Sequence, residues 1–503
     1  MTNPGDFPRV FKTQFPPEKS KLIVLPEHSV SREVTGRILE DSSGILTEGL
    51  GANLPPAFQN GQEDAYPSSE RDWNRLYGHM DWLGLNILRY WLIGEAVIPE
   101  PGTFRRDHVY IERLVRLHDW AARRNARLIL DFGVVPSWLR FGTPASQPQE
   151  TAAPSDPDAY IDRFAMPILR YLKRDLGLDR IRYLCLFNEP FNPDFTDYSF
   201  YTPDGIDPFV HYGRLYWKMR KRLDAEGFPA AEIGLIGPNS HDLFVQPLIE
   251  MEKRGIDWTG FLSAVDEHAY RMRLDSLPEA GHMPTLTIGE TLSRYLAPAV
   301  AHAHRSGKPY LLTEYSCFYY GGITGDPDGP SRHESALTEA EFIVRAMAAG
   351  AGGGLKWSLI NSGRNDGKWQ YIETVDGSYE PVPAVYFVNA VLTRYLPRDG
   401  RIHPVRFEGA GAGFVHGTAF RYPGDWTVLL VNDHPAEKFA LCLEEPRRRP
   451  GAIHAWQTDP LRKHRRIPVE TGHGRVRLEL PAMSLTAVTS FTLEAGEDGL
   501  IEV

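Results

Sequence analysis

Cysteine is scarce in this chain, which has only Cys185, Cys317 and Cys442 among its 503 residues. The three lie far apart in the sequence, without the spacing of metal ligands or of a paired disulfide framework. This excludes a small disulfide-stapled scaffold and favours a reducing compartment. We expect all three thiols to be buried in a core.

Long runs of positive charge are also lacking. The formal net charge is −10, and no unbroken run of basic residues is longer than a triplet such as Arg447-Arg448-Arg449. Binding to nucleic acid and to an anionic membrane both need concentrated positive charge, so we expect neither partner. The ligand is instead expected to be neutral or small.

No long apolar run is present either. No stretch reaches the roughly 20 apolar residues that cross a bilayer. The N-terminal residues 1–6, Met-Thr-Asn-Pro-Gly-Asp, lack a basic region followed by an apolar segment. We therefore expect no membrane span and no secretory signal, and interpret the chain as cytoplasmic. Its 42% hydrophobic and 24% charged residues are typical of a soluble globular protein.

What the sequence does contain is a repeated alternation of short aliphatic runs and longer stretches of helical periodicity. This alternation is typical of βα units that build a parallel sheet. Eight consecutive units predict an α/β fold of the (β/α)8 TIM-barrel type, because a closed sheet has no exposed edge. The predicted strands are residues 50–54, 86–91, 127–132, 181–187, 232–237, 263–269, 309–315 and 353–359.

The last hundred residues have a different character. Alternating runs are separated there by Gly, Pro and Asn/Asp turns, which predicts an appended antiparallel β-sandwich domain. The runs are residues 426–431, 475–480 and 484–491, and strand-like segments also occur near the N-terminus at 21–25 and 30–39. We therefore divide the chain into N-terminal strands that join the sandwich (1–45), a catalytic barrel (46–398) and a C-terminal sandwich (399–503).

Two glutamates stand at predicted strand ends, where barrel proteins carry their functional groups. Glu189 follows the fourth strand in Phe-Asn-Glu-Pro, and Glu314 ends the seventh in Leu-Thr-Glu-Tyr. Cleavage of a glycosidic bond needs one carboxylic acid that protonates the leaving oxygen and one carboxylate that attacks or activates water. Since strands four and seven face each other across a barrel, we expect these carboxyl groups about 5–5.5 Å apart, the separation in retaining enzymes.

These segments resemble the acid/base and nucleophile segments of glycoside hydrolase clan A. The resemblance implies that Glu189 is the general acid/base, Glu314 the nucleophile, and Asn188 a partner of a sugar hydroxyl. Burial and a second carboxylate are expected to keep Glu189 protonated near neutral pH, while Glu314 stays ionised.

Other positions agree with the same clan. Arg89, His268, Tyr270 and Trp357 resemble positions around the cleaved sugar. The segments 136–138 and 236–238, with the appended sandwich, are most similar to families thirty and thirty-nine. Many members carry a histidine near the end of strand three, where this chain has Asp131-Phe132-Gly133.

The predicted substrate-binding side chains lie at strand ends and in the loop that follows strand eight. They are Asn188, Arg89, His268, Tyr270, Trp357, Trp138, Asp131, Asn239, Asn361 and Trp369. Structural alternatives remain open for several of them. Arg89 and Asp131 are also compatible with a buried ion pair, His268 with an interior hydrogen bond, and Trp138 and Trp357 with core packing.

Metal and phosphate sites are not expected. His302 and His304 fall on a predicted helix, where residues two apart point to different faces. The glycine cluster 350–354 runs into a strand without a following Lys-Ser/Thr, so it is interpreted as easing strand eight into a crowded barrel. We predict neither a metal nor a cofactor.

The predicted function is a retaining β-glycoside hydrolase that cleaves O-glycosidic bonds of a carbohydrate substrate by double displacement. Cytoplasmic placement favours exo cleavage of short oligosaccharides or glycosides. The alternatives are a transglycosidase with the same catalytic pair, a non-catalytic carbohydrate-binding barrel, and a metal-dependent hydrolase. The sequence leaves open the sugar, the linkage and the oligomeric state.

Overall fold

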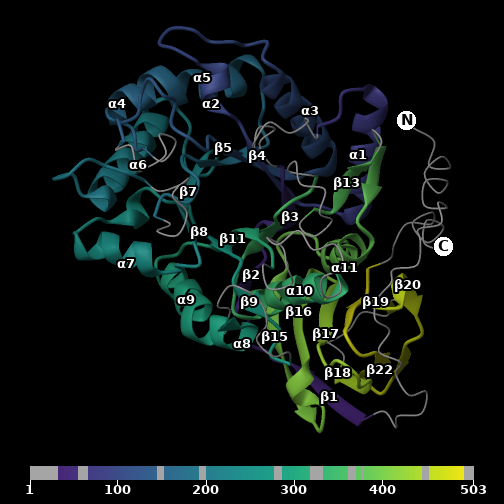
Figure 1. Ribbon diagram of the computed structural model, residues 1–503. Coiled ribbons are helices and arrows are strands. Elements are labelled where there is room, and N and C mark those ends of the chain that lie inside the picture. The colour runs from purple at the N-terminus through teal and green to yellow at the C-terminus, as the bar shows by residue number, and fades with distance from the viewer. Residues whose placement is uncertain are drawn as a thin grey trace.

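The computed structural model describes residues 32–54, 66–143, 152–191, 200–276, 286–317, 332–360, 370–375, 378–444 and 452–491. Eight parallel strands close into a barrel in the order β11-β12-β3-β4-β5-β6-β7-β8 (Figure 1). They are β3 (Gly49–Leu54), β4 (Ile87–Trp91), β5 (Arg127–Asp131), β6 (Ile181–Cys185), β7 (Gly234–His241), β8 (Ala264–Ala269), β11 (Tyr310–Tyr315) and β12 (Gly353–Lys356). Each predicted strand overlaps one of these, and the predicted (β/α)8 barrel is confirmed.

The lumen of the barrel is a packed core. It is filled by Ile87, Ile129, Tyr183, Cys185, Ile236, Ala264, Leu311 and Leu355, two from β6 and one from every other barrel strand except β3. Glycine is required where strands crowd together: a Cβ on Gly353 would come within 2.8 Å of the Gly49 carbonyl oxygen. This agrees with the interpretation of the glycine cluster as an accommodation to close packing.

Helices cover the outside of the barrel. The main ones are α1 (Glu70–Leu83), α3 (Val109–Arg124), α6 (Pro208–Ala225), α7 (Gln246–Lys253), α9 (Ala297–Arg305), α10 (Arg332–Ala348) and α11 (Pro383–Thr393). Helix α1 begins after Ser69, whose hydroxyl accepts a hydrogen bond from the Asp72 amide at 3.2 Å. It ends at Gly84, whose φ of 69° is the left-handed conformation that glycine adopts without strain.

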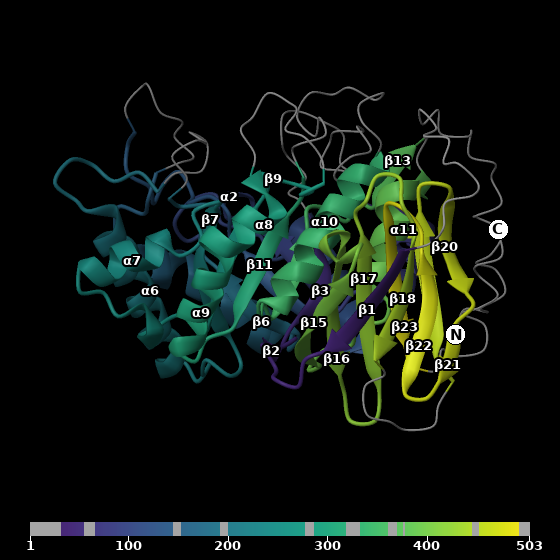
Figure 2. The same ribbon diagram turned by 90° about the horizontal axis from the view of Figure 1, so that it is seen from below.

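The C-terminal region forms one curled, largely antiparallel sheet of eleven strands beside the barrel (Figure 2). These are β1 (Arg32–Ile38), β2 (Gly44–Ile45), β15 (Arg401–Gly409), β16 (Val415–Arg421), β17 (Trp426–Asn432), β18 (Phe439–Glu444), β19 (His454–Asp459), β20 (Arg462–Ile467), β21 (Glu470–Gly472), β22 (Arg475–Leu480) and β23 (Ser484–Thr489). Strand β1 pairs antiparallel with β15 and parallel with β18, so an N-terminal strand lies inside this sheet. The predicted antiparallel β domain is confirmed; its predicted segment 21–25 lies outside the described residues.

Barrel and sheet share one hydrophobic core. Helix α10 packs on β16 and β17, and α11 packs on β19, β20 and β23. The main core accordingly contains sheet residues such as Leu429, Trp456 and Leu485 together with the barrel helices. The three cysteines are buried and free, as predicted. Among the described helices, none is both long and apolar enough to cross a membrane.

Candidate active site

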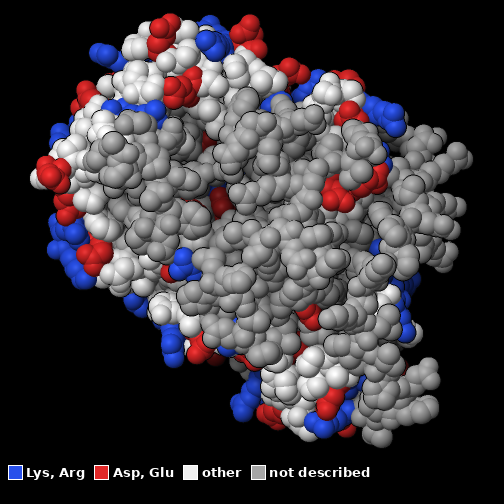
Figure 3. Space-filling model, viewed as in Figure 1, with Lys and Arg blue, Asp and Glu red and all other residues white. Residues whose placement is uncertain are grey.

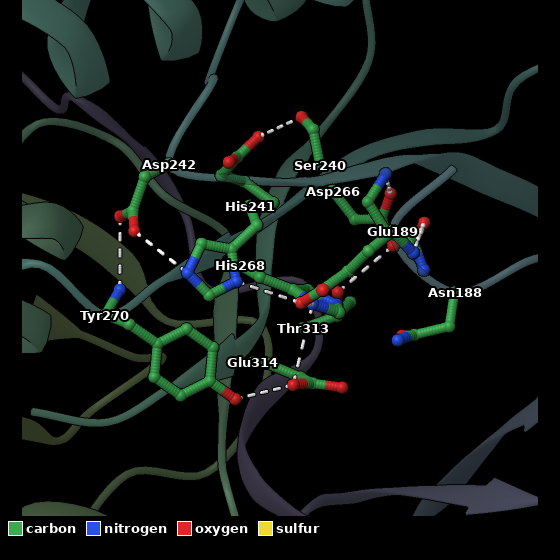
Figure 4. A network of polar contacts seen from close by, with 12 residues as sticks. Asn188, Glu189, Ser240, His241, Asp242, Asp266, His268, Tyr270, Thr313 and Glu314 are labelled. Carbon is green, nitrogen blue, oxygen red and sulfur yellow. Dashed lines mark hydrogen bonds and ion pairs between the residues drawn. The ribbon is translucent and has the colours of Figure 1, made fainter. Parts of the chain in front are cut away.

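Glu189 and Glu314 meet at the C-terminal end of the barrel. Glu314 belongs to β11, and Glu189 lies in the turn that follows β6. Both residues are buried, with 5% and 4% of their surface exposed, and a carboxylate oxygen of one lies within 4.8 Å of a carboxylate oxygen of the other. Figure 4 shows the two side chains pointing toward each other with His268 between them. Acidic atoms are visible at the bottom of a hollow over the barrel in Figure 3.

Glu189 has a backbone conformation that side chains rarely adopt. Its φ is 45°, in the left-handed region where a residue other than glycine is uncommon. Asn239 holds this turn in place, because its Oδ1 accepts a hydrogen bond from the Glu189 amide at 3.1 Å. Strained backbone of this kind persists only where surrounding contacts enforce it, and such positions cluster at functional sites.

Glu314 is held by two donors of different kinds. The Tyr270 hydroxyl donates to its Oε2 at 2.6 Å, and Arg89 donates to its Oε1. Burial raises the pKa of Tyr270 well above its usual value, so the phenol keeps its proton and remains a donor. A carboxylate that accepts from a guanidinium and a phenol is stabilised in its charged form and fixed in orientation.

Arg89 organises the floor of the site from β4. It is fully buried, and its guanidinium also donates to Asp131 and, at 2.8 Å, to Asn188 Oδ1. Asp131 in turn accepts from the Gly133 amide at 2.5 Å. Asp131 is therefore the buried ion-pair partner of Arg89. This is the structural alternative that the sequence analysis left open for these two residues.

Glu189 is surrounded by histidines instead. His268 Nδ1 donates to its Oε1 at 2.7 Å, and His241 Nδ1 donates to the same oxygen at 3.1 Å. The other ring nitrogen of His241 lies 3.2 Å from Asp242 Oδ2. The His241 ring stacks on Tyr270, with centroids 4.9 Å apart and an interplanar angle of 9°. His241 therefore contacts both halves of the site.

These contacts decide whether Glu189 or His241 holds the proton that they share. Burial acts to raise the pKa of Glu189, but the hydrogen bonds from His241 and His268 outweigh it and hold that pKa well below its usual range. Burial acts to lower the pKa of His241, but Asp242 and Glu189 raise it to about 10. The expectation that burial keeps Glu189 protonated is thus wrong, because the histidine contacts outweigh burial and the proton lies on the imidazole of His241.

Two asparagines at the strand ends have different roles. Both polar groups of the Asn239 side chain are engaged by protein, since its Nδ2 also donates to Cys185 Sγ at 2.9 Å. The structure therefore places Asn239, predicted to bind substrate, as a positioning residue for Glu189. Asn188 uses only its Oδ1, toward Arg89, and no described residue accepts from its amide nitrogen, which is left as a donor for a ligand.

The predicted aromatic contacts separate into two groups. Trp357 lies at the site in a small apolar cluster with Trp91 and Tyr270, and 7% of its surface is exposed. Trp138 is only partly buried; its indole N–H donates to the Ile98 carbonyl at 3.0 Å and its ring packs on the main core. Its position favours the packing alternative. The predicted contacts Asn361 and Trp369 lie outside the described residues.

His241 is the functional side chain that the sequence interpretation missed. The predicted fifth strand ended at residue 237, just before Pro238, a residue that cannot donate to a sheet ladder. The observed β7 continues to His241, with an irregularity between Pro238 and Ser240 that brings His241 into register with His268. The signal that was available is the Ser240-His241-Asp242 sequence directly after Asn239.

Three of these residues are also candidate metal ligands. Glu189, His268 and Glu314 are spaced closely enough to hold an ion. However, Glu189 Oε1 already accepts from His268, and both carboxylate oxygens of Glu314 already accept, one from Arg89 and one from Tyr270. On α9, His302 bonds to Glu252 at 2.8 Å while His304 is exposed, so the two histidines do not converge.

The first testable prediction concerns His241. Replacing it in His241→Gln removes the group that retains a proton up to about pH 10, and leaves Glu189 with His268, which favours the charged carboxylate. We expect the basic limb of kcat/KM against pH to move to lower pH by about one unit or more, with kcat reduced about tenfold to a hundredfold.

Asp242→Asn is the matched control. It keeps the imidazole of His241 and weakens only one of its partners, so a smaller shift of the basic limb is expected. A basic limb that stays in place in both variants would contradict the proton assignment.

Comparison with known proteins rests on structure. No family model matches the sequence, and a search of curated proteins finds no match. The catalytic domain of the GH30 xylanase C from Talaromyces cellulolyticus is similar, with a TM-score of 0.63 and 14% identity over 91% of this chain and 100% of that one. The GH51 arabinofuranosidase from Xanthomonas axonopodis pv. citri has a TM-score of 0.60 and 13% identity over 91% and 99% of the two chains.

A family 39 glycoside hydrolase from Bacteroides cellulosilyticus WH2 is similar as well, with a TM-score of 0.56 and 14% identity over 89% of this chain and 81% of that one. Identities this low establish a common fold and leave activity to be argued from the site. The chain therefore has the fold of the clan A glycoside hydrolases of families 30, 39 and 51, and the resemblance predicted from its sequence is confirmed at that level.

Proposed function

We propose that this protein is a retaining β-glycoside hydrolase. The observation that carries the proposal is the pair of buried carboxylates whose nearest oxygens lie within 4.8 Å of each other. Retaining glycosidases hold their two carboxyl groups about 5–5.5 Å apart, whereas inverting enzymes need roughly 6.5–9.5 Å to admit a water molecule between them. The geometry favours the retaining mechanism.

The different surroundings of the two carboxylates support the assignment of roles. Glu314 accepts from Arg89 and Tyr270, which stabilise a carboxylate that must stay charged to act as nucleophile. Glu189 shares a proton with His241, so acid is available beside the leaving oxygen. Two carboxyl groups with opposed environments are the usual basis for dividing acid and nucleophile roles.

In the first step, a Glu314 oxygen attacks the anomeric carbon and forms a glycosyl ester, while the bond to the leaving oxygen breaks. The leaving oxygen takes a proton from Glu189, which is supplied in turn by His241. In the second step, water attacks the anomeric carbon and gives its proton to Glu189, and the ester bond to Glu314 breaks. Two displacements at one carbon retain its configuration.

The groups around the pair fit a neutral sugar. Trp357 offers an aromatic surface beside the nucleophile, and the free amide nitrogen of Asn188 can donate to a ring hydroxyl. We propose exo cleavage of short glycosides as the activity. Since two of the similar structures are named a xylanase and an arabinofuranosidase, xylosides and arabinosides are the first substrates to test.

The experiment is a panel of aryl β-xyloside, β-glucoside, β-galactoside and arabinoside substrates, with the anomer formed first identified by NMR. We expect turnover of at least one member, with the released sugar first appearing in the anomeric configuration of its substrate, before mutarotation. A product that first appears with the opposite configuration would exclude the double displacement, and no turnover on any member would count against hydrolysis of simple glycosides. Adding a sugar acceptor tests the transglycosidase alternative, which predicts that transfer outcompetes release to water.

A further inference from the structure

A second cluster of metal-ligating side chains lies where α10 meets the curled sheet. Glu341 comes from α10, His416 from β16, and Asp433 follows the last residue of β17. One potential ligand atom from each lies within 4.8 Å of the others. Both carboxylate residues are fully buried, and the His416 side chain is 15% exposed. None of the three takes part in the proposed glycosidase chemistry.

The atoms that face this cluster lack hydrogen-bond partners. In the described part of the chain, neither carboxylate oxygen of Asp433 has a partner, nor does Glu341 Oε2 or His416 Nε2. Buried polar atoms are almost always satisfied by protein, water or an ion. Four unsatisfied atoms from three side chains, converging on one point, therefore indicate a bound ligand rather than an isolated packing defect.

The charges around the cluster indicate the sign of that ligand. Glu341, Asp433 and the nearby Asp275 supply three carboxylates, whereas the ion pairs recorded for Arg345 go to Glu341 at 2.7 Å and Asp275 at 3.0 Å. Three carboxylates thus surround one guanidinium, so a divalent cation is a ligand of the sign that would compensate them.

The distances are compatible with one ion. His416 Nε2 lies 3.5 Å from Glu341 Oε1 and 3.9 Å from Asp433 Oδ2. Two ligands at about 2.1 Å from a tetrahedral zinc ion are separated by roughly 3.4 Å, so only small side-chain adjustments are needed. An imidazole ligand favours zinc over magnesium or calcium, which prefer oxygen.

We propose that Glu341, His416 and Asp433 bind one zinc ion, which ties α10 of the barrel to the curled sheet. Water completes the coordination. Neighbouring groups hold the ligands in place: Arg345 donates to Glu341, and the Ser276 hydroxyl donates to the Asp433 carbonyl at 2.8 Å. No ligand spacing is visible in the sequence, because one ligand lies on a barrel helix, one on β16 and one just after β17.

The test uses the full chain, stripped with a chelator and then dialysed against zinc. We expect one zinc ion per chain by mass spectrometry of the metal content. We also expect Tm to rise by roughly 3 °C at a zinc concentration about 100 times Kd, because the ion binds the folded state only. Absence of both stoichiometric zinc and a Tm shift in the unmodified protein would overturn the proposal.

Variants locate the ion. Asp433→Asn and His416→Gln keep the approximate shape of the side chains and are expected to abolish zinc binding. If one of these two variants does not fold, Glu341→Gln is tested in its place. Glu314→Gln and His302→Gln are matched controls, because they remove the other candidate positions at the active site and on α9, and both are expected to keep the zinc. Loss of zinc in a control, with retention in Asp433→Asn, would place the ion elsewhere and refute the assignment.

Discussion

Glu314→Ala is expected to lose hydrolysis of every glycoside that the unmodified protein cleaves, with kcat reduced by about 10⁴-fold or more. The reason is that Glu314 supplies the electron pair that forms the covalent intermediate, and no other described carboxylate replaces it at that position. Asp131, the next carboxylate on Arg89, is fully buried and already engaged by that guanidinium and by the Gly133 amide.

Chemical rescue makes this prediction specific. Alanine leaves room beside Arg89 and Tyr270, which normally bind the carboxylate, so azide can occupy the same place. Azide would then displace the leaving group in a single step, and we expect an α-glycosyl azide from a β-glycoside, identified by NMR. Full hydrolytic activity in Glu314→Ala, or a rescued product of β configuration, would show that Glu314 is not the nucleophile.

A matched control separates loss of chemistry from loss of fold. Glu267 is a fully buried glutamate on β8, and its carboxylate accepts from the Ser240 hydroxyl at 2.6 Å and from the Leu243 amide at 3.1 Å. Glu267→Gln therefore changes the same residue type with similar burial near the same end of the barrel, without touching Glu314. It is expected to retain most of the activity, and the Tm of both variants checks their folding.

The sequence was sufficient for the barrel because its signals are local and repeated. Each strand is a short apolar run, and parallel order follows from the intervening helices, so all eight strands were located. Among the strand ends, the largest difference is that of β7, predicted at residue 237 and observed at His241. A proline in a strand normally marks its limit, and the continuation past Pro238 depends on pairing with β8, which no local pattern reveals.

In the candidate site, too, the positions of residues could be predicted from local patterns, but their contacts could not. Positions at strand ends could be predicted, so Glu189, Glu314, Arg89 and Tyr270 were found and do meet. Partner assignments depend on register, and a shift of one residue turns a side chain to the other face of a strand. The irregularity in β7 sets the His241 contact with Glu189, and hence the location of the proton. For the same reason the role of Asn239 was not foreseen.

Glu189→Ala should produce a loss that depends on the leaving group. For substrates with a poor leaving group, kcat is expected to fall about 10²-fold to 10⁴-fold, because the departing oxygen then leaves without a proton. For an activated aryl glycoside such as the dinitrophenyl compound, formation of the glycosyl ester needs no acid and stays fast. Its hydrolysis slows, since water has lost its base, so a burst of phenol followed by a slow steady rate is expected.

Azide is expected to give a different product with Glu189→Ala than with Glu314→Ala. It needs no base and can enter the space left by Glu189, on the face opposite Glu314. It should therefore displace Glu314 from the glycosyl ester and give a β-glycosyl azide. The basic limb of the pH profile should also disappear, because His241 and His268 would have no carboxylate through which to deliver a proton. An equal loss on good and poor leaving groups, with no azide product, would mean that Glu189 only maintains the shape of the site. In that case the proton held by His241 would need another route to the substrate.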